Sequence, residues 1–247
     1  FNRRNDEIGN LSSALNNMTV TLLNRIDTIE KFSADVAHEL RNPLTSLRSA
    51  IEAFPVIKSK NERLELIRII KEDIDRIDRL ISDISESSKL DTALTMEERE
   101  IIDIYEFLYE LIELQNSRYK TNGIILNQDE RGIKLYSIIN RDRLNQVFIN
   151  LFDNARSFSN SNDSICVTLK NDDDDIFIEV SDLGGGIQGT KIDRIFDRFY
   201  TDREKDTEAK MHSGLGLSIV KQIVDSHKGE ISVENFEIDL KKGARFK

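Results

Sequence analysis

One short stretch of the chain, residues 38–44, groups side chains that could carry out nucleophilic or proton-transfer chemistry. It reads His-Glu-Leu-Arg-Asn-Pro-Leu. An imidazole is a nucleophile at neutral pH when one ring nitrogen is unprotonated, and Glu39 could accept a hydrogen bond from the other ring nitrogen of His38. Asn42 is four residues from His38, so the two share a face if the segment is helical. A lone His-Glu pair, however, is roughly three times more often a plain helix surface.

Three later patches have the composition of a nucleotide site. Asn150 and Asn154 are four residues apart, and two neutral oxygen donors on one helix face can hold a hydrated Mg²⁺. Asp182 opens the run Asp-Leu-Gly-Gly-Gly-Ile, and a carboxylate can accept a hydrogen bond from an exocyclic amino group such as that of adenine. Gly216 opens a predicted helix whose first N–H groups could face a phosphate. Each patch alone is weak, since polar helix faces and glycine turns are common.

Two long helices are predicted to position the histidine. Apolar residues recur at helical spacing from Phe32 to Leu47, and Pro43 predicts a kink one turn after His38. Upstream, apolar residues recur every seven positions from Ile8 to Val36, which predicts a coiled-coil seam. A loop at 54–61 and a second helix at 62–89 follow. Each helix has a narrow apolar stripe, so we expect two copies of the hairpin to pair as a four-helix bundle through residues 31–90.

The remainder of the chain predicts an α/β domain behind a polar linker at 91–100. Alternating and helical patterns place its elements, and Asn140 is the predicted cap of its second helix. The acidic run at 171–175 is read as a solvated hairpin tip, because it lacks the spaced ligands of a calcium loop. This order predicts a two-layer sandwich with a mixed sheet. The predicted helices are 104–118, 140–158, 192–199 and 216–226, and the predicted strands are 123–128 and 132–139 around an Asp-Glu-Arg turn, 164–170, 176–181 and 230–234.

Composition excludes several classes of function. The chain has 247 residues, a net charge of −10, 38% hydrophobic and 32% charged residues. A net acidic chain lacks the basic surface that nucleic-acid binding needs. One cysteine, Cys166, excludes an internal disulfide and a zinc site built from cysteines. No apolar run has membrane-span length, and the chain starts at Phe1, so we expect a fragment of a longer protein.

The motifs together resemble those of bacterial sensor histidine kinases. Residues 38–44 resemble their phosphoacceptor box, H-E-x-x-N/T-P-L. The patches at 150–155, 182–187, 195–200 and 214–220 resemble the N, G1, F and G2 boxes of the Bergerat-type ATPase domain, also found in type II topoisomerases, Hsp90 and MutL. Only the kinases place the histidine box upstream. The run at 35–50, with 81–85, is similar to the alphaproteobacterial ChvG/ExoS type of these kinases.

The resemblance implies a role for individual residues. His38 would accept the γ-phosphoryl group of ATP, with Glu39 and Asn42 beside it, and Asn150 would bind Mg²⁺. Two positions depart from the family pattern: Gly185 replaces a proline, and Ser157 replaces a phosphate-binding lysine. We expect Arg156 or a cation of the loop at 200–213 (Arg203, Lys205 or Lys210) to substitute for that lysine. The implied ATP-contacting residues are Asn150, Asn154, Arg156, Phe158, Asp182, Gly184, Gly186, Ile187, Phe199, Gly214, Leu215, Gly216 and Leu217.

The resemblance also implies an organisation and partners. Residues 1–30 would be the last helix of a HAMP relay, 31–92 the dimerisation and phosphotransfer hairpin, and 93–247 the catalytic ATP-binding domain. We expect a homodimer that passes phosphate to an aspartate of a response regulator and dephosphorylates it, without nucleic acid. This portion would be cytoplasmic and reach the inner membrane only through preceding segments. Two alternatives are a Bergerat ATPase that is not a kinase and a signalling dimer whose ATPase domain has decayed.

Overall fold

The computed structural model describes residues 7–57, 59–93, 98–119, 121–128, 134–172, 175–200, 214–238 and 241–247. The chain divides into two compact units, Phe1–Leu80 and Ile81–Lys247. No helix in the described ranges is long and apolar enough to cross a membrane.

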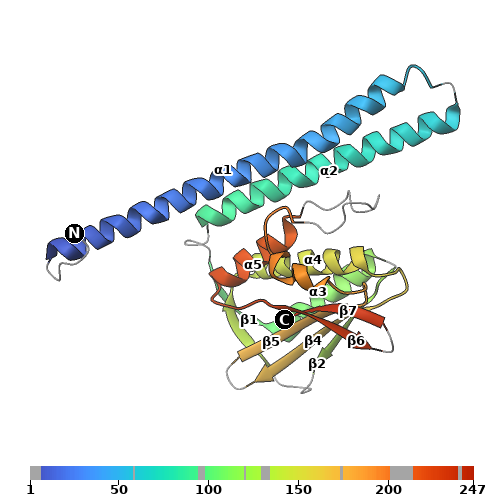
Figure 1. Cartoon of the computed structure of the whole chain (residues 1–247). Helices are drawn as coiled ribbons and strands as arrows, with labels where there is room; N and C mark the ends of the chain where they lie inside the picture. The colour runs from blue at the N-terminus through green and yellow to red at the C-terminus, as the bar shows by residue number, and fades with distance from the viewer. Residues whose placement is uncertain are drawn as a thin grey trace. The chain divides into compact units, whose positions relative to one another are not determined.

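The first unit is a helical hairpin (Figure 1). Helix α1 spans Glu7–Ala53 and continues through Pro43. Helix α2 spans Lys60–Ala93 and so extends into the second unit. The prediction of two helices is confirmed, although α2 begins two residues early. Helix α2 also includes residues 91–93 of the linker predicted at 91–100. Residues 94–97 of that linker lie outside the described residues.

The two helices bury one stripe of side chains against each other. Pro43 and Ala50 of α1 and Asp73 and Leu80 of α2 are buried. A second stripe on each helix stays exposed, at the seven-residue spacing of a helical seam. On the hairpin it consists of Leu44, Ile51, Ile67, Ile74 and Ile81. The first half of α1 likewise exposes Leu11, Leu15, Met18, Leu22 and Ile29.

The second unit is a two-layer sandwich of helices on a mixed sheet, as predicted. The sheet has the order β2-β4-β5-β7-β6, in which only the β2–β4 pair is parallel. Three helices cover one face of this sheet (Figure 1). The strands are β2 (Ile124–Gln128), β4 (Ile165–Asp172), β5 (Asp175–Asp182), β6 (Val233–Ile238) and β7 (Lys241–Phe246), and the helices are α3 (Ile104–Arg118), α4 (Arg141–Phe158) and α5 (Gly216–Ser226).

Alternation along β4 explains how the layers meet. Ile165, Val167 and Leu169 are fully buried, while the residues between them are partly exposed. Successive side chains of a strand point to opposite faces, so one face carries the apolar set. Phe148 and Phe152 of α4 are also buried, with ring centroids 6.0 Å apart.

Side-chain caps fix where two of these helices begin. Asn140 accepts a hydrogen bond from the Arg143 N–H, which confirms it as the predicted cap of α4. Asp103 caps α3 in the same way, by accepting from the N–H groups of Tyr105 and Glu106. Both caps satisfy helix N–H groups that have no partner within the helix.

Three predicted elements were wrong or displaced. Strand β3 (Tyr136–Ile139) pairs antiparallel with β1 (Glu100–Asp103), which the sequence did not predict, and not with β2. The turn residues at 129–131 lie outside the described residues. In place of a helix at 192–199 there is a short 3-10 helix, η1 (Gly189–Arg194). The strand predicted at 230–234 starts at Val233 instead, and β7 follows it.

Candidate functional site

The N-terminus of α5 lies beside the polar face of α4. A Cβ built on Gly216 would stand 3.7 Å from both Cγ and Oδ1 of Asn150. Helix α5 has no side-chain cap, and its first helical bond runs from the Ile219 N–H to the Leu215 carbonyl. The N–H groups before Ile219 therefore lack helical partners and form a partially positive end next to Asn150. Two motifs more than sixty residues apart are thus brought together.

Asp182 is a buried acid at the end of β5. Its side chain is 3% exposed, and Oδ1 accepts a hydrogen bond from the Gly184 N–H at 2.9 Å. Burial raises the pKa of Asp182, and the hydrogen bonds from the Gly184 and Ala244 backbone oppose that rise only in part. A buried carboxylate in a glycine loop can recognise a hydrogen-bond donor such as an amino group.

The glycine loop after Asp182 packs against the last residue of α4. A Cβ at Gly184 would lie 2.5 Å from Cβ of Phe158, so no larger residue fits there. Gly185 has a φ of +86°, and its N–H donates to the Lys242 carbonyl. Proline can provide neither that dihedral nor that donor. The departure at Gly185 therefore tethers this loop to the β6–β7 side of the sheet by a bond that a proline could not make.

Asn235 of β6 is a site residue that the sequence analysis missed. Its Oδ1 accepts from the Ile187 N–H at 2.7 Å, and its Nδ2 donates to the Ile187 carbonyl at 2.6 Å. A Cβ on Gly186 would stand 2.9 Å from the same Oδ1. The side-chain amide thus pairs with the loop as a neighbouring strand would. The strand predicted at 230–234 stopped one residue short of it, so no pattern in the sequence pointed to Asn235.

Phe199 and Gly214, which lie on either side of residues 201–213, pack against each other. Phe199 has a φ of +60° and Gly214 a φ of +70°. A Cβ on Gly214 would lie 2.7 Å from the Phe199 carbonyl carbon, so glycine is required there for space and for conformation. Leu215 is fully buried and Leu217 half-buried, which anchors the start of α5. Arg203, Lys205 and Lys210 lie outside the described residues.

The structure places Arg156 away from the Asn150 and Asn154 face of α4. Its guanidinium lies 4.0 Å from the centroid of the Tyr119 ring, and Nη1 donates to Gln115 Oε1 at 3.0 Å. Both partners belong to the end of α3, and the Arg156 side chain is 11% exposed. Burial lowers the Arg156 pKa, opposed by the nearby charge of Asp153. A phosphate contact from Arg156 would require this packing to be given up.

His38 is exposed on α1, as is Asn42 one turn later. Glu39 does not contact the His38 ring, contrary to the expected geometry. Its Oε2 accepts instead from Nη2 of Arg76 on α2, at 2.9 Å. Neighbouring positions on a helix point about 100° apart, which favours a partner on the facing helix. Among the described residues no hydrogen bond reaches the His38 ring.

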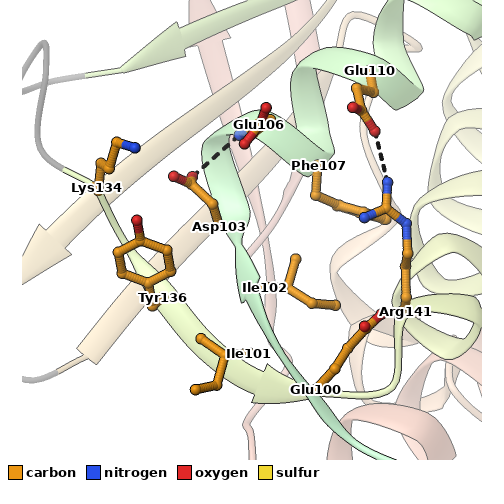
Figure 2. Close-up of a pocket in the computed structure, with 10 residues that line it drawn as sticks. All are labelled: Glu100, Ile101, Ile102, Asp103, Glu106, Phe107, Glu110, Lys134, Tyr136 and Arg141. Atoms are coloured by element: carbon orange, nitrogen blue, oxygen red, sulfur yellow. Dashed lines mark hydrogen bonds and ion pairs between the residues drawn. The ribbon is translucent and has the colours of Figure 1, made fainter.

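A separate pocket of about 300 Å³ lies at the start of α3 and α4 (Figure 2). Arg141 crosses it, 2.6 Å from Glu110 and with its guanidinium 5.4 Å from the Phe107 ring centroid. Arg141 precedes Asn150 by nine residues, or roughly 14 Å of helix. No residue of the glycine motifs lines it. The pocket is lined by Glu100, Ile101, Ile102, Asp103, Glu106, Phe107, Glu110, Lys134, Tyr136 and Arg141.

Comparisons with known proteins match two segments of the chain to domain families. Residues 28–93 match the model of the His Kinase A (phospho-acceptor) domain. Residues 139–247 match that of the histidine kinase-, DNA gyrase B- and HSP90-like ATPase. Together the two matches cover more than two thirds of the chain.

Curated relatives and solved structures agree with these matches. Sensor protein ChvG of Agrobacterium fabrum is 44% identical over 100% of this chain and 43% of its own length. Sensor protein kinase WalK of Staphylococcus aureus is 33% identical over 84% of this chain and 50% of its own. The chain therefore spans less than half the length of ChvG.

Two structures of histidine kinase ThkA share the fold. Its catalytic domain is 27% identical, with a TM-score of 0.50 over 61% of this chain and 94% of that one. ThkA in complex with response regulator protein TrrA is 23% identical, with a TM-score of 0.67 over 90% of this chain and 62% of that one. A phosphoacceptor domain followed by an ATPase domain, with ChvG-like sequence throughout, means that this chain belongs to the family of sensor histidine kinases.

Proposed function

We propose that the chain is the kinase core of a sensor: it binds ATP in its second unit and transfers the γ-phosphoryl group to His38. The observation that carries the proposal is that three sequence motifs meet around α4. Asn150 lies beside the start of α5, and Phe158 lies beside the loop that follows Asp182. Three motifs distant in sequence thus border one helix, in a chain that also exposes a histidine of the phosphoacceptor type.

The second unit supplies a distinct group for each part of ATP. Asp182 would accept a hydrogen bond from the adenine amino group, with Gly184, Gly186 and Ile187 forming the adjoining backbone. The N–H groups at Gly216 and Leu217, which have no side-chain cap among the described residues, would face the phosphates, since helix N-termini favour anions. Asn154, Phe158, Phe199, Gly214 and Leu215 would complete the contacts.

Mg²⁺ would be bound at this site mainly by the phosphates of ATP and by water, with few ligands from the protein. No group of three or more His, Cys, Asp or Glu side chains in the described ranges could hold a metal ion. Mg²⁺ commonly keeps several waters and binds through one or two protein groups plus substrate phosphates. The Asn150 amide oxygen would be such a group, and the ion would neutralise phosphate charge when bound.

The transfer itself is a balanced exchange of one bond for another. One ring nitrogen of His38 forms a P–N bond as the bond between the γ-phosphorus and its bridging oxygen breaks, and ADP leaves. The phosphoryl transition state is loose, so positioning and charge neutralisation supply most of the rate. The phosphoryl group would then pass to an aspartate of a response regulator. Asn42, exposed one turn from His38, would position water for dephosphorylation of that regulator.

The proposed partners follow from the hairpin and from the relatives. Its exposed seven-residue stripes call for a second copy, since a four-helix bundle would cover them. A response regulator is the partner of ThkA in its complex, and we propose the same class of partner here. Domain limits of 1–30, 31–92 and 93–247, a HAMP-like first segment and placement at the inner membrane remain predictions.

Incubation with γ-labelled ATP tests the proposal. The wild-type chain should acquire acid-labile label, and His38→Ala should lose the label while still binding a non-hydrolysable ATP analogue. Asp182→Asn, as the companion variant, should bind the analogue roughly tenfold or more weakly and acquire less label at limiting ATP. Hydrolysis of ATP without labelled protein would favour a non-kinase ATPase, and absence of analogue binding would favour a decayed domain.

A further inference from the structure

The hairpin seam contains one guanidinium and two carboxylates. Arg76 of α2 pairs with Glu39 of α1 at 2.9 Å, and their side chains are 16% and 23% exposed. Asp73, one turn earlier on α2, is 7% exposed, and its Oδ2 has no hydrogen-bond partner among the described residues. Nε of Arg76 is also buried and has no partner in that part of the chain. Residues three apart on a helix are neighbours on one face, so Asp73 is within reach of Arg76.

This arrangement leaves one buried charge unsatisfied. A buried acceptor without a partner is costly, and native structures retain such groups where they have a purpose. If Arg76 turned from Glu39 to Asp73, the number of ion pairs in the seam would stay the same. The buried carboxylate would gain a partner, and the more exposed Glu39 would be released. Two states that exchange one ion pair for another form a bistable element.

We propose that Arg76 is a positioning residue that determines whether Glu39 is available to His38. In the structure Arg76 holds Glu39, and the His38 ring is without a hydrogen bond from the described residues. In the second state Asp73 takes Arg76, and Glu39 accepts a hydrogen bond from the ring N–H of His38. The opposite ring nitrogen is then the unprotonated one that attacks the γ-phosphorus, while the other ring proton is retained in the bond to Glu39.

The inference rests on the proposed kinase function but concerns a different property. His38, Glu39, Asp73 and Arg76 all belong to the first unit, whereas the ATP-contacting residues belong to the second. A change in the seam should therefore alter the rate of phosphorylation at saturating ATP. It should leave the KM for ATP unchanged. A general loss of structure would lower the rate for every variant.

Opposite effects of two substitutions test the exchange. In the full chain, Arg76→Gln frees Glu39 and should raise kcat for autophosphorylation by about tenfold, the scale expected when a minor state of about ten per cent becomes the major one. Asp73→Asn leaves Glu39 as the sole carboxylate partner of Arg76 and should lower kcat several-fold. Arg76→Lys should restore a rate near that of the wild type. Arg68→Gln, which removes two exposed ion pairs elsewhere on α2, is the matched control and should leave kcat and the ring signals unchanged.

A spectroscopic measurement separates this proposal from the kinase assignment. The ¹⁵N chemical shifts of the His38 ring should change in Arg76→Gln in the absence of ATP, since Glu39 then binds the ring, and should stay unchanged in Asp73→Asn. Opposite kcat effects together with this shift support the exchange. Effects of the same sign, an unaltered rate in Arg76→Gln, a changed KM, or unshifted ring signals overturn it. Absence of phosphohistidine in the wild type would instead reject the proposed function, while the ring signals would still decide the exchange.

Discussion

Asp182 shows how a single residue can serve binding at a cost to stability. It is buried at the end of β5, and burial raises its pKa. A carboxyl with a raised pKa in the folded state contributes stability below its ordinary pKa, which is lost as the pH rises through the raised value. Above the ordinary carboxyl pKa, the burial of Asp182 therefore opposes folding. Such a charge is retained where a ligand needs it.

Asp182→Asn should separate the two effects. We expect a higher thermal midpoint at neutral pH, with the gain disappearing in acid below the ordinary carboxyl pKa. Affinity for an ATP analogue should fall by roughly tenfold or more, because a charge-assisted hydrogen bond is replaced by a neutral one. Thermal melts from pH 3 to 8 and calorimetric titration measure both. Asp175→Asn, at the exposed start of the same strand, is the control. A lower midpoint with intact affinity would contradict the assignment.

The neighbours of Arg156 argue against a phosphate-binding role for this residue. It stacks on Tyr119 and bonds Gln115, on a face of α4 different from that of Asn150. Arg156→Ala should leave affinity for the ATP analogue within about twofold and destabilise the second unit by roughly 1–3 kcal/mol, through lost cation–π contact and packing. Denaturant unfolding and analogue titration test this. Arg156→Lys should recover part of the stability. A marked loss of ATP affinity in Arg156→Ala would restore the phosphate role expected from sequence.

Secondary-structure elements hold the glycine loop from two sides. Phe158 ends α4 against Gly184, and Asn235 of β6 binds both backbone groups of Ile187. The loop is therefore fixed by an element that comes some fifty residues later in the chain. This explains why β6 and β7 belong to the site although no motif lies on them.

Asn235→Ala should weaken nucleotide binding by releasing the loop at Ile187. Two hydrogen bonds of about 1 kcal/mol each hold this loop, and without them the nucleotide has to order it on binding, so the Kd for the ATP analogue should rise by up to roughly ten- to thirtyfold. The thermal midpoint should fall as well, because both bonds lie within the folded protein. Asn235→Asp keeps the acceptor and loses the donor, so its Kd for the ATP analogue should lie between those of the wild type and Asn235→Ala. Glu237→Ala, exposed on the same strand, should leave the Kd unchanged; equal effects of the two alanine variants would remove Asn235 from the site.

At the scale of the whole molecule, the exposed stripe of the hairpin is the dominant feature. Ile67, Ile74 and Ile81 are about half exposed at seven-residue spacing. A contiguous apolar stripe on a water-facing helix is typical of a helix-pairing surface. We therefore expect this stripe to pair with a second copy of the chain.

Ile74→Glu should convert the dimer into monomers. Burying a carboxylate in the seam costs several kcal/mol, enough to shift the equilibrium at micromolar protein. Light scattering coupled to size exclusion gives the mass directly. Asn61→Glu introduces the same charge at an exposed polar position of α2 and should stay dimeric. A mass that does not change in Ile74→Glu would show that another surface holds the copies together.

The sequence by itself determined the segments of α1 to α5, where α4 begins, and which residues belong to the motifs, although the helix predicted at 192–199 was wrong. These follow from local properties: the limits of α3 and α5 were predicted correctly because the apolar periodicity of each helix lies within its own segment. The β4–β5 hairpin was predicted for the same reason.

Only the tertiary structure decided which side chains meet. Glu39 could have turned to His38 or to the facing helix, and the register of α1 against α2 assigned it to Arg76. Strand β3 could have paired with β2, but it pairs with β1 while β2 pairs with β4. Arg156 was adjacent to the motif in sequence yet points to α3. Such choices depend on contacts between residues far apart in the chain, and no local pattern encodes them.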